Sequence, residues 1–324
     1  MLEWADVIHL HWINFGFLSL SGLKKILLLQ KPVLWTLHDM WALTGGCFHS
    51  RGCVGFQTVC SNCPYLKEGN TLAAKVMAKK KALYELGNLN FIAISSWIEQ
   101  QIRASAVFNG RVYRVPNPID TDFFVPAEDK IAVRRALGLP EDKIIIGFIA
   151  YNVSNPYKGI GYLLKAIKIL REISPQIYDR LMLLAIGKIK SIERTDVTEK
   201  IRFTGYVKQE EQMRSYYQAM DLFVLPSLEE NLPLVLQEAM SCGVPCVAFS
   251  VGGIPDLIEH EQTGYLAKVK DSEDLAHGIL WALENGEKLG EKVREYMVRE
   301  FSYKVVSQRF LEVYEAALSD KKIV

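Results

Sequence analysis

Glu230 and Glu238 stand eight residues apart, and the residues between them have the features of a helix start. Asn231 is an acceptable N-cap, and Pro233 is tolerated in a first helical turn because the N–H that it lacks would be unpaired there. Free backbone N–H groups and the positive end of the helix dipole attract phosphate. Glu238, about 10 Å further along at the rise of an α-helix, can accept hydrogen bonds from sugar hydroxyls. The pattern therefore suits a ligand that carries both phosphate and sugar.

The surrounding elements favour this interpretation over a chance pair of glutamates on a solvated helix. Residues 221–225 have the composition of a buried strand, and residues 246–249 form another after a turn through Gly243 and Pro245. Strand, loop, helix, turn and strand make a βαβ unit, in which the loops at the carboxyl ends of the strands form the ligand crevice. A second glycine-containing loop, residues 250–255, follows the next strand in the same way.

With these features, the sequence resembles the family 4 retaining glycosyltransferases of the GT-B fold, whose E-x7-E motif is matched by Glu230 and Glu238. Residues 203–207 (FTGYV) are similar to the family's segment near the nucleotide base, residues 116–120 (PNPID) to its interdomain motif, and residues 33–39 (VLWTLHD) to its strand followed by His-Asp. The resemblance extends over most of the chain. It implies an α/β fold of two doubly wound Rossmann-like domains that face each other across a cleft.

The same resemblance implies an activity and a set of site residues. The activity is transfer of a sugar from a nucleotide diphosphate donor, UDP- or GDP-linked, to a hydroxyl acceptor with retention, in the assembly of surface polysaccharide or lipopolysaccharide. The implied catalytic residues are His38, Lys158 and Glu230. The implied donor-binding residues lie near the helix start and at the end of the FTG segment; they are Glu238, Asn231, Leu232, Pro233, Leu234, Gly205 and Tyr206.

Lys158 matches the lysine of the family's Lys-Gly pair, and it would offset the negative charge that develops on a departing diphosphate. Because backbone amides and Lys158 supply positive charge, no catalytic metal ion is required. The chain departs from the family at residues 152–157, which lack the arginine that usually precedes this lysine. A surface lysine that caps a turn is the alternative interpretation of Lys158.

Three histidines lie in the first part of the chain. His38 follows a predicted strand at its carboxyl end, where it can hydrogen-bond a sugar hydroxyl or stabilise a transition state. His9 and His11 alternate on one strand face, and they either line the same cleft or pack as satisfied core histidines. Asp39 either orients His38 or caps the next turn. Ser95 either matches a serine of the resembled family or is only the N-cap of a helix.

Four of the six cysteines fall within seventeen residues of a turn-rich segment: Cys47, Cys53, Cys60 and Cys63. The Cys60-x-x-Cys63 spacing suits tetrahedral Zn²⁺, and His49 is nearby. A structural zinc site is therefore expected, with free packed thiols as the alternative and disulfides disfavoured in a reducing compartment. Cys242 and Cys246 flank a turn into a core strand, and we expect them to pack as small hydrophobic side chains.

At 324 residues with 49% hydrophobic content, the chain is long enough for two domains with separate cores. Strand-like and helix-like segments alternate along it; residues 7–11, 33–37, 90–94, 144–149 and 181–186 are the predicted strands, and residues 19–29, 72–86 and 159–171 the predicted helices. We expect residues 1–127 to form an acceptor-side domain, residues 128–304 the nucleotide-sugar-binding domain, and residues 305–324 a helix that crosses back onto the first domain. We expect the first domain to lack the opening strand and glycine-rich loop of the resembled family. A shortened reading frame is the favoured explanation, and loss of part of the acceptor site is the alternative.

The net charge of +1 gives no reason to expect nucleic-acid binding. Residues 1–127 carry 12 Lys and Arg against 8 Asp and Glu, which favours an anionic membrane surface unless the lysines are simply scattered. No apolar run approaches the roughly 18 residues of a membrane-spanning helix, and the first residues lack the features of a signal peptide. We therefore expect a cytoplasmic protein, in peripheral contact with the inner face of a membrane at most. Its partners would be a nucleotide sugar and a glycan or lipid-linked acceptor.

Two other functions fit the same features. A GT-B sugar-nucleotide epimerase shares the fold but would form no product linked to an acceptor. A non-catalytic sugar-nucleotide-binding scaffold is favoured by the incomplete first domain.

Overall fold

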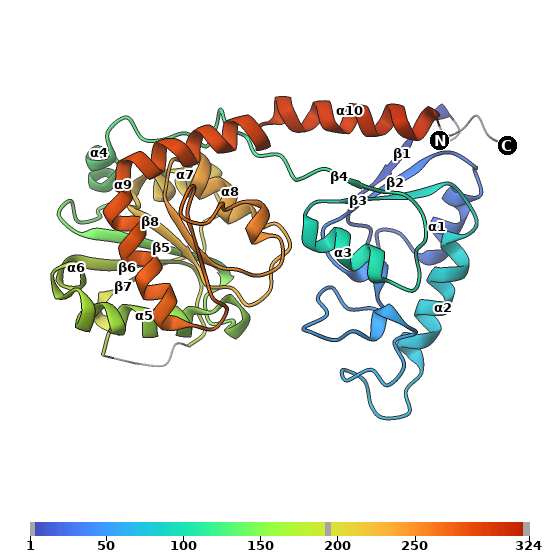
Figure 1. The fold of residues 1–324 in the computed structure, drawn as a ribbon, viewed down its shortest axis with the longest axis horizontal. Coiled ribbons are helices and arrows are strands. Elements are labelled where there is room, and N and C mark those ends of the chain that lie inside the picture. The colour runs from blue at the N-terminus through green and yellow to red at the C-terminus, as the bar shows by residue number, and fades with distance from the viewer. Residues whose placement is uncertain (1–3, 192–195, 320–324) are drawn as a thin grey trace. The chain divides into compact units, whose positions relative to one another are not determined.

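The computed structural model describes residues 4–191 and 196–319, which form two compact α/β units (Figure 1). Unit 1 takes the chain up to Asn117 together with the residues from Val306 onward, and unit 2 takes Pro118–Val305. The sequence-based boundary lies further along, after residue 127. Each unit is built on its own parallel sheet, which confirms the predicted α/β class with two Rossmann-like domains.

The sheet of unit 1 has the order β1-β2-β3-β4, and neighbouring strands are parallel. Its strands and flanking elements are β1 (Ile8–Leu10), α1 (Leu20–Leu27), β2 (Val33–Leu37), the 3₁₀ turns Trp41–Leu43 and Gly55–Gln57, α2 (Leu72–Tyr84), β3 (Leu89–Ala93), α3 (Ser96–Ala104) and β4 (Val112–Arg114). Every residue of β2 and β3 is buried, as continuous apolar runs in parallel strands predict. Side chains that follow β1 and β2 therefore lie at the same edge of the sheet.

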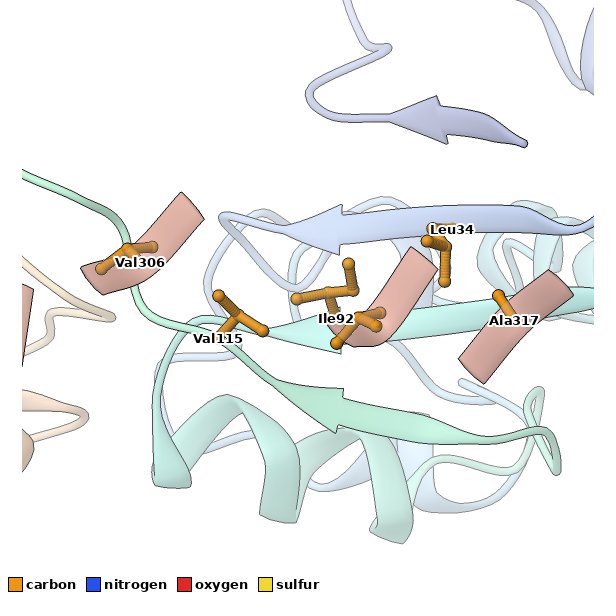
Figure 2. Close-up of a cluster of buried hydrophobic side chains, with 6 residues drawn as sticks. Leu34, Ile92, Val115, Val306 and Ala317 are labelled. Atoms are coloured by element: carbon orange, nitrogen blue, oxygen red, sulfur yellow. The ribbon is translucent and has the colours of Figure 1, made fainter. Parts of the chain in front are cut away.

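The last helix, α10 (Tyr303–Ser319), packs against the sheet of unit 1 from Val306 onward. Figure 2 shows a buried cluster that joins this helix to the sheet, made by Val306, Val313 and Ala317 of α10 with Leu34, Ile92 and Val115. A polar contact accompanies it, because the Tyr314 hydroxyl lies 2.8 Å from Nδ1 of His9. The described part of the helix predicted over residues 305–324 thus docks on unit 1 through one apolar face, and residues 320–324 lie outside the described residues.

The sheet of unit 2 has the order β10-β9-β8-β5-β6-β7 and is parallel throughout. Its strands are β5 (Ile144–Asn152), β6 (Leu181–Lys188), β7 (Ile201–Gly205), β8 (Leu222–Leu225), β9 (Cys246–Phe249) and β10 (Tyr265–Ala267). Its helices are α4 (Lys130–Ala136), α5 (Ile160–Ile173), α6 (Pro175–Arg180), α7 (Glu210–Ala219), α8 (Leu234–Ser241) and α9 (Ser272–Phe301).

The strand order of unit 2 reverses between β5 and β8. After β5 the chain builds β6 and β7 on one side, and it then returns to add β8 on the other side of β5. Loops diverge at such a switch point, and open α/β sheets bind ligands there, outside the carboxyl ends of the strands. The loops that follow β5 and β8 are therefore the expected ligand-binding region of unit 2.

Among the described residues, no helix has both the length and the apolar composition needed to cross a membrane.

Candidate functional site

The loops after β5 and β8 touch each other at the switch point. The loop after β5 ends in a 3₁₀ turn, Pro156–Lys158, which is followed by Gly159 at a φ of 77°. A Cβ at Gly159 would overlap the carbonyl oxygen of Pro226, so only glycine fits this close approach. The backbone N–H of Leu228 also donates to the Tyr157 carbonyl at 2.8 Å. The loop that carries Lys158 is thus fixed directly against the loop that carries Glu230.

Lys158 and Glu230 form an ion pair across these two loops. Nζ of Lys158 lies 2.6 Å from Oε1 of Glu230, and the side chains are 33% and 12% exposed. The loop after β9 reaches the same place, because Gly252, at a φ of 55°, packs against the Glu230 carbonyl where a Cβ would overlap it. The turn-capping alternative for Lys158 is therefore incomplete, since its ammonium group is directed to a carboxylate of the E-x7-E pair.

Helix α8 begins later than the sequence indicates. Its N-cap is Pro233, with φ −71° and ψ 119°, and its first residue is Leu234. Asn231 was predicted as the N-cap; this is wrong, because the helix begins only at Leu234 and proline disfavours the helical conformation at Leu232, the residue before it. Asn231 is instead a buried loop residue, 6% exposed. The eight-residue helix still places its N-terminus beside the Glu230 loop.

Glu238 lies in the middle of α8, and its carboxylate is held by Tyr217 of α7. The Tyr217 hydroxyl donates to Oε2 of Glu238 at 2.6 Å, and Tyr217 is fully buried. Burial raises the pKa of Glu238, while the bond from Tyr217 opposes this shift. Burial and the neighbouring Glu238 charge raise the pKa of Tyr217 well above its usual value, so the phenol remains a donor. Sequence reasoning missed Tyr217, which lies on a different helix.

A cluster of two tyrosines and a lysine occupies the carboxyl ends of β5, β6 and β7. Nζ of Lys188 donates to the Tyr151 hydroxyl at 2.6 Å and lies 4.4 Å and 5.4 Å from the ring centres of Tyr151 and Tyr206. The two rings are 5.6 Å apart at 74°, and both side chains are exposed. Gly205 ends β7 at a φ of 79° and thereby turns the chain into Tyr206. Exposed aromatic faces beside a cation can stack on a flat ring.

Of this cluster, Tyr206 was predicted as a donor-binding residue, whereas Tyr151 and Lys188 were not. Their only signal in the sequence is that each lies at the end of a predicted strand or just beyond it. Without the sheet order, nothing shows that these ends are neighbours.

In unit 1 the residues after β1 bond to the residues after β2. Nδ1 of His11 lies 3.1 Å from Nε2 of His38, and Nε1 of Trp12 donates to Oδ2 of Asp39 at 2.8 Å. Nε1 of Trp35 donates to the His11 carbonyl at 2.7 Å, which fixes the backbone of this pair. Asp39 also accepts from the Trp41 N–H at 2.7 Å, so it caps the following turn, as one of its two interpretations stated.

His9 completes the group of imidazoles. Its ring lies 4.3 Å from that of His11, and its two nitrogens bond to the hydroxyls of Tyr314 and Thr36, both at 2.8 Å. His9 is thus a satisfied, half-buried histidine. Burial, reinforced by the neighbouring histidines, lowers the pKa of His9 and of His38 to about 4. Both rings are therefore neutral near pH 7.

Lys80 is a buried lysine that sequence reasoning overlooked, since a lysine on a helix is usually solvated. Its side chain is completely buried, and its ammonium group donates to the carbonyls of Trp41 and of Thr44, the latter at 2.8 Å. It lies 3.8 Å from the centre of the Trp41 ring. Burial lowers the pKa of Lys80 to about 7. Lys80 thereby holds the turn that follows Asp39.

Among the described residues, nothing supports the zinc site expected at the cysteine cluster. The four thiols line one cavity of about 300 Å³, and the six cysteines of the chain are unpaired: Cys47, Cys53, Cys60, Cys63, Cys242 and Cys246. Across residues 4–191 and 196–319, no group of three or more His, Cys, Asp or Glu side chains is arranged to hold a metal ion. Burial also raises the pKa values of the Cys47 and Cys60 thiols.

The remaining two cysteines and Ser95 have structural roles. Cys242 and Cys246 are 4% and 0% exposed, which agrees with packing as small hydrophobic side chains. Ser95 is the N-cap of α3, where its hydroxyl accepts from the Ile98 N–H at 3.2 Å. Its structural role is therefore clear.

Two parallel sheets, one of them with charged loops and a helix N-terminus at its switch point, place the protein in the doubly wound α/β class. Comparison with known families makes this more specific. The family described as Glycosyl transferases group 1 matches residues 129–299, and Glycosyltransferase Family 4 matches residues 2–123. The chain therefore belongs to the glycosyl transferases group 1 family, as the sequence resemblance predicted.

Curated relatives include proteins with different names. The chain is 29% identical to N-acetyl-alpha-D-glucosaminyl L-malate synthase of Bacillus anthracis over 66% of its own length and 56% of the relative. It is 28% identical to the putative colanic acid biosynthesis glycosyl transferase WcaC of Escherichia coli, over 75% of this chain and 58% of that one. The chain thus spans little more than half the length of these relatives.

Solved structures share the fold at low sequence identity. Sucrose-phosphate synthase from Thermosynechococcus elongatus superposes with a TM-score of 0.69 at 23% identity, over 97% of this chain and 74% of that one. HepE from Anabaena in complex with UDP gives 0.69 at 19% identity, over 97% and 80%. HepE in complex with UDP-glucose gives 0.66 at 18% identity, over 97% and 80%. These neighbours establish the GT-B fold of the chain.

Proposed function

We propose that the protein transfers a sugar from a nucleoside diphosphate donor to a hydroxyl acceptor with retention of configuration at the transferred carbon. The observation that carries this proposal is the meeting of Lys158, Glu230 and the start of α8 at the switch point of unit 2. Relatives named as glycosyl transferases, and fold neighbours solved with UDP or UDP-glucose, support it.

The donor would lie along the loop that leads into α8. Backbone amides of the Asn231–Leu234 segment and the Lys158 ammonium group would hold the diphosphate, since both provide positive charge. Glu238 would accept hydrogen bonds from the ribose, with its carboxylate oriented by Tyr217. Glu230 would bind hydroxyls of the donor sugar. We propose that no metal ion is needed for this chemistry, because the charge is already supplied.

The base would lie at the carboxyl end of β7, where Gly205 and Tyr206 were predicted to contact the donor. Tyr151 and Lys188 extend that surface. An aromatic face of this kind accepts either a pyrimidine or a purine, so both UDP- and GDP-linked sugars are suitable donors.

His38 of unit 1 would contact the transferring sugar. With its pKa lowered to about 4, the ring is neutral and can exchange hydrogen bonds with a hydroxyl without adding charge. This is the role assigned to it from the sequence.

The acceptor would be a glycan or a lipid-linked sugar in surface polysaccharide assembly, and the protein would work in the cytoplasm against the inner face of a membrane. Exposed aromatic side chains of unit 1, Trp12, Phe15 and Phe17, precede the basic pair Lys24 and Lys25 of α1. Aromatic and basic groups together suit an anionic lipid surface. We expect the protein to sediment with phosphatidylglycerol vesicles but not with phosphatidylcholine vesicles. Failure to bind either kind of vesicle would contradict the membrane contact.

A donor screen tests the activity. Release of UDP or GDP is measured for a panel of UDP- and GDP-linked hexoses, first without and then with glycan acceptors. NMR of the product gives the configuration of the new bond. A product with inverted configuration would contradict retention, and failure to bind any nucleoside diphosphate would contradict the proposed function itself.

A further inference from the structure

Asn14 carries a buried polar group that the protein itself leaves without a partner. Its side chain is 9% exposed, and its Oδ1 atom has no hydrogen-bond partner among the described residues. Buried side-chain oxygens are nearly always bonded, so an exception in a well-packed region requires an explanation. The main chain around Asn14 is hydrogen-bonded, since the Asn14 carbonyl accepts from the Phe17 N–H and the Ile13 carbonyl accepts from the Leu18 N–H.

Asn14 lines a small cavity at the carboxyl ends of β1 and β2. Asn14 lines this cavity together with His11, His38 and Asp39. The cavity volume is about 10 Å³, which is close to the space that one water-sized oxygen needs. A single hydroxyl therefore fits, and a larger group such as phosphate does not.

The side chains that line the cavity favour a hydroxyl group over an anion or an ammonium group. A side-chain carbonyl and the Asp39 carboxylate are acceptors and disfavour an anion, while the imidazoles of His11 and His38 bond to each other as neutral rings. A hydroxyl group can donate to the Asn14 oxygen and also accept a hydrogen bond, so it satisfies such a mixed site. An ammonium group would find only one nearby carboxylate, and both oxygens of that carboxylate are already bonded to Trp12 and Trp41.

We infer that Asn14, with the His11–His38 pair, forms a pocket for one sugar hydroxyl. This inference rests on the proposed function, which supplies the sugar, and it names a contact residue beyond those of the glutamate and lysine loops. The hydroxyl belongs either to the donor sugar or to the acceptor, and the kinetic measurements below distinguish these two sources.

Stability provides the first test. Asn14→Leu keeps the branched shape and the number of side-chain heavy atoms and removes the unpaired oxygen, so the unfolding temperature is expected to stay equal or to rise. Asn90→Leu is the matched control, because Asn90 is 4% exposed but its amide is bonded to Asn88 at 2.9 Å. That control is expected to lower the unfolding temperature. A similar fall for Asn14→Leu would show a structural role and overturn the inference.

Kinetics provide the second test. Asn14→Leu is expected to lower kcat/KM by about three- to twelvefold, the value of one neutral hydrogen bond. Calorimetric binding of UDP or GDP alone is expected to be unchanged. If donor hydrolysis without acceptor is impaired, the hydroxyl is the donor's; if only transfer to an added acceptor is impaired, it is the acceptor's. Unchanged kcat/KM in both assays overturns the inference.

A third readout does not depend on turnover. The side-chain amide signal of Asn14 in ¹⁵N NMR spectra is expected to shift when a bound sugar nucleotide is added, beyond the shift with the nucleoside diphosphate alone. A signal that stays unchanged with every sugar nucleotide that binds overturns the pocket and leaves the proposed function intact. If no sugar nucleotide binds, the proposed function fails first, and the sugar-hydroxyl pocket with it.

Discussion

Nζ of Lys158 lies 2.6 Å from Oε1 of Glu230, and this pair joins the loop after β5 to the loop after β8. The attraction between these two partly buried charges offsets part of the free energy that each loses with its hydration. We expect a bound diphosphate to compete with Glu230 for Lys158. The Glu230 carboxylate would then be released toward the sugar hydroxyls, so that one ion pair prepares both groups for the donor.

Replacement of Lys158 and replacement of Glu230 are therefore expected to have different effects on turnover and nucleotide binding. Lys158→Met should lower turnover more than nucleotide affinity, because the negative charge that it balances grows as the bond to phosphate breaks. Glu230→Gln should lower transfer while leaving nucleoside diphosphate binding unchanged or tighter, since Lys158 is no longer held by a charge. Calorimetry and steady-state kinetics measure the difference.

The control for Lys158 is Lys168→Met, which removes an exposed lysine 3.8 Å from Asp196. It should change neither quantity. Equal weakening of nucleotide binding by Lys158→Met and Glu230→Gln would contradict the competition between Glu230 and the diphosphate.

Tyr217 is expected to matter through Glu238. Tyr217→Phe keeps the buried ring but removes the bond to the carboxylate, so Glu238 loses its fixed orientation and its pKa rises further. Nucleoside diphosphate affinity should fall by about three- to tenfold. Tyr178→Phe, at another buried tyrosine of unit 2, should leave the affinity unchanged. The prediction is wrong if both variants bind alike.

Stability should decrease on the acid side because of the buried imidazoles. The pKa values of His9 and His38 are about 4 in the folded protein, against 6.5 for an ordinary histidine, chiefly through burial. Between these two values the unfolded chain binds more protons, so the free energy of unfolding falls as the pH falls from about 6.5 to about 4.

Urea denaturation across this range measures the pH slope. His9→Gln should make it shallower, whereas His277→Gln, which replaces an exposed histidine of α9, should not. An identical slope in the wild-type protein and His9→Gln would show that His9 is not held neutral by its surroundings.

The docked face of α10 should contribute measurably to the stability of unit 1. Val306 is completely buried against the sheet, so Val306→Ala removes two methyl groups and leaves a cavity. The free energy of unfolding should fall by about 1–3 kcal/mol. Leu311→Ala, on the same helix at 52% exposure, should change it by less than about 0.5 kcal/mol. Equal effects would mean that α10 is not docked through this face.

The sequence was sufficient for the strands with long apolar runs and for the loops that bear chemistry, but it did not predict β4, β7 or β10. Continuous apolar runs identified β2 and β5 within a few residues of their limits, because parallel strands buried on both faces need such runs. The loops of Lys158 and Glu230 could then be placed at carboxyl ends. Their direct contact at 2.6 Å was not predicted, since it depends on β5 lying beside β8.

The remaining features depend on contacts between distant elements. Tyr217 reaches Glu238 from another helix, and Lys188 reaches Tyr151 from another strand, so no local pattern reveals either pair. Lys80 has the composition of a solvated helix residue, yet the turn after Asp39 buries it. The zinc prediction relied on spacing alone, which does not fix the geometry of the four thiols that line one cavity.

The central claim concerns Glu238, because the proposed donor site depends on the E-x7-E pair. The decisive measurement is calorimetric affinity for UDP and GDP in the wild-type protein and in Glu238→Ala. Glu210→Ala is the control, since it removes a nearby carboxylate that raises the pKa of Glu238 but leaves the Tyr217 bond in place. A hydrogen bond to a charged group predicts that Glu238→Ala weakens binding by roughly ten- to more than a hundredfold, with little change for Glu210→Ala. Unchanged affinity in a folded Glu238→Ala protein would contradict the donor site proposed for this chain.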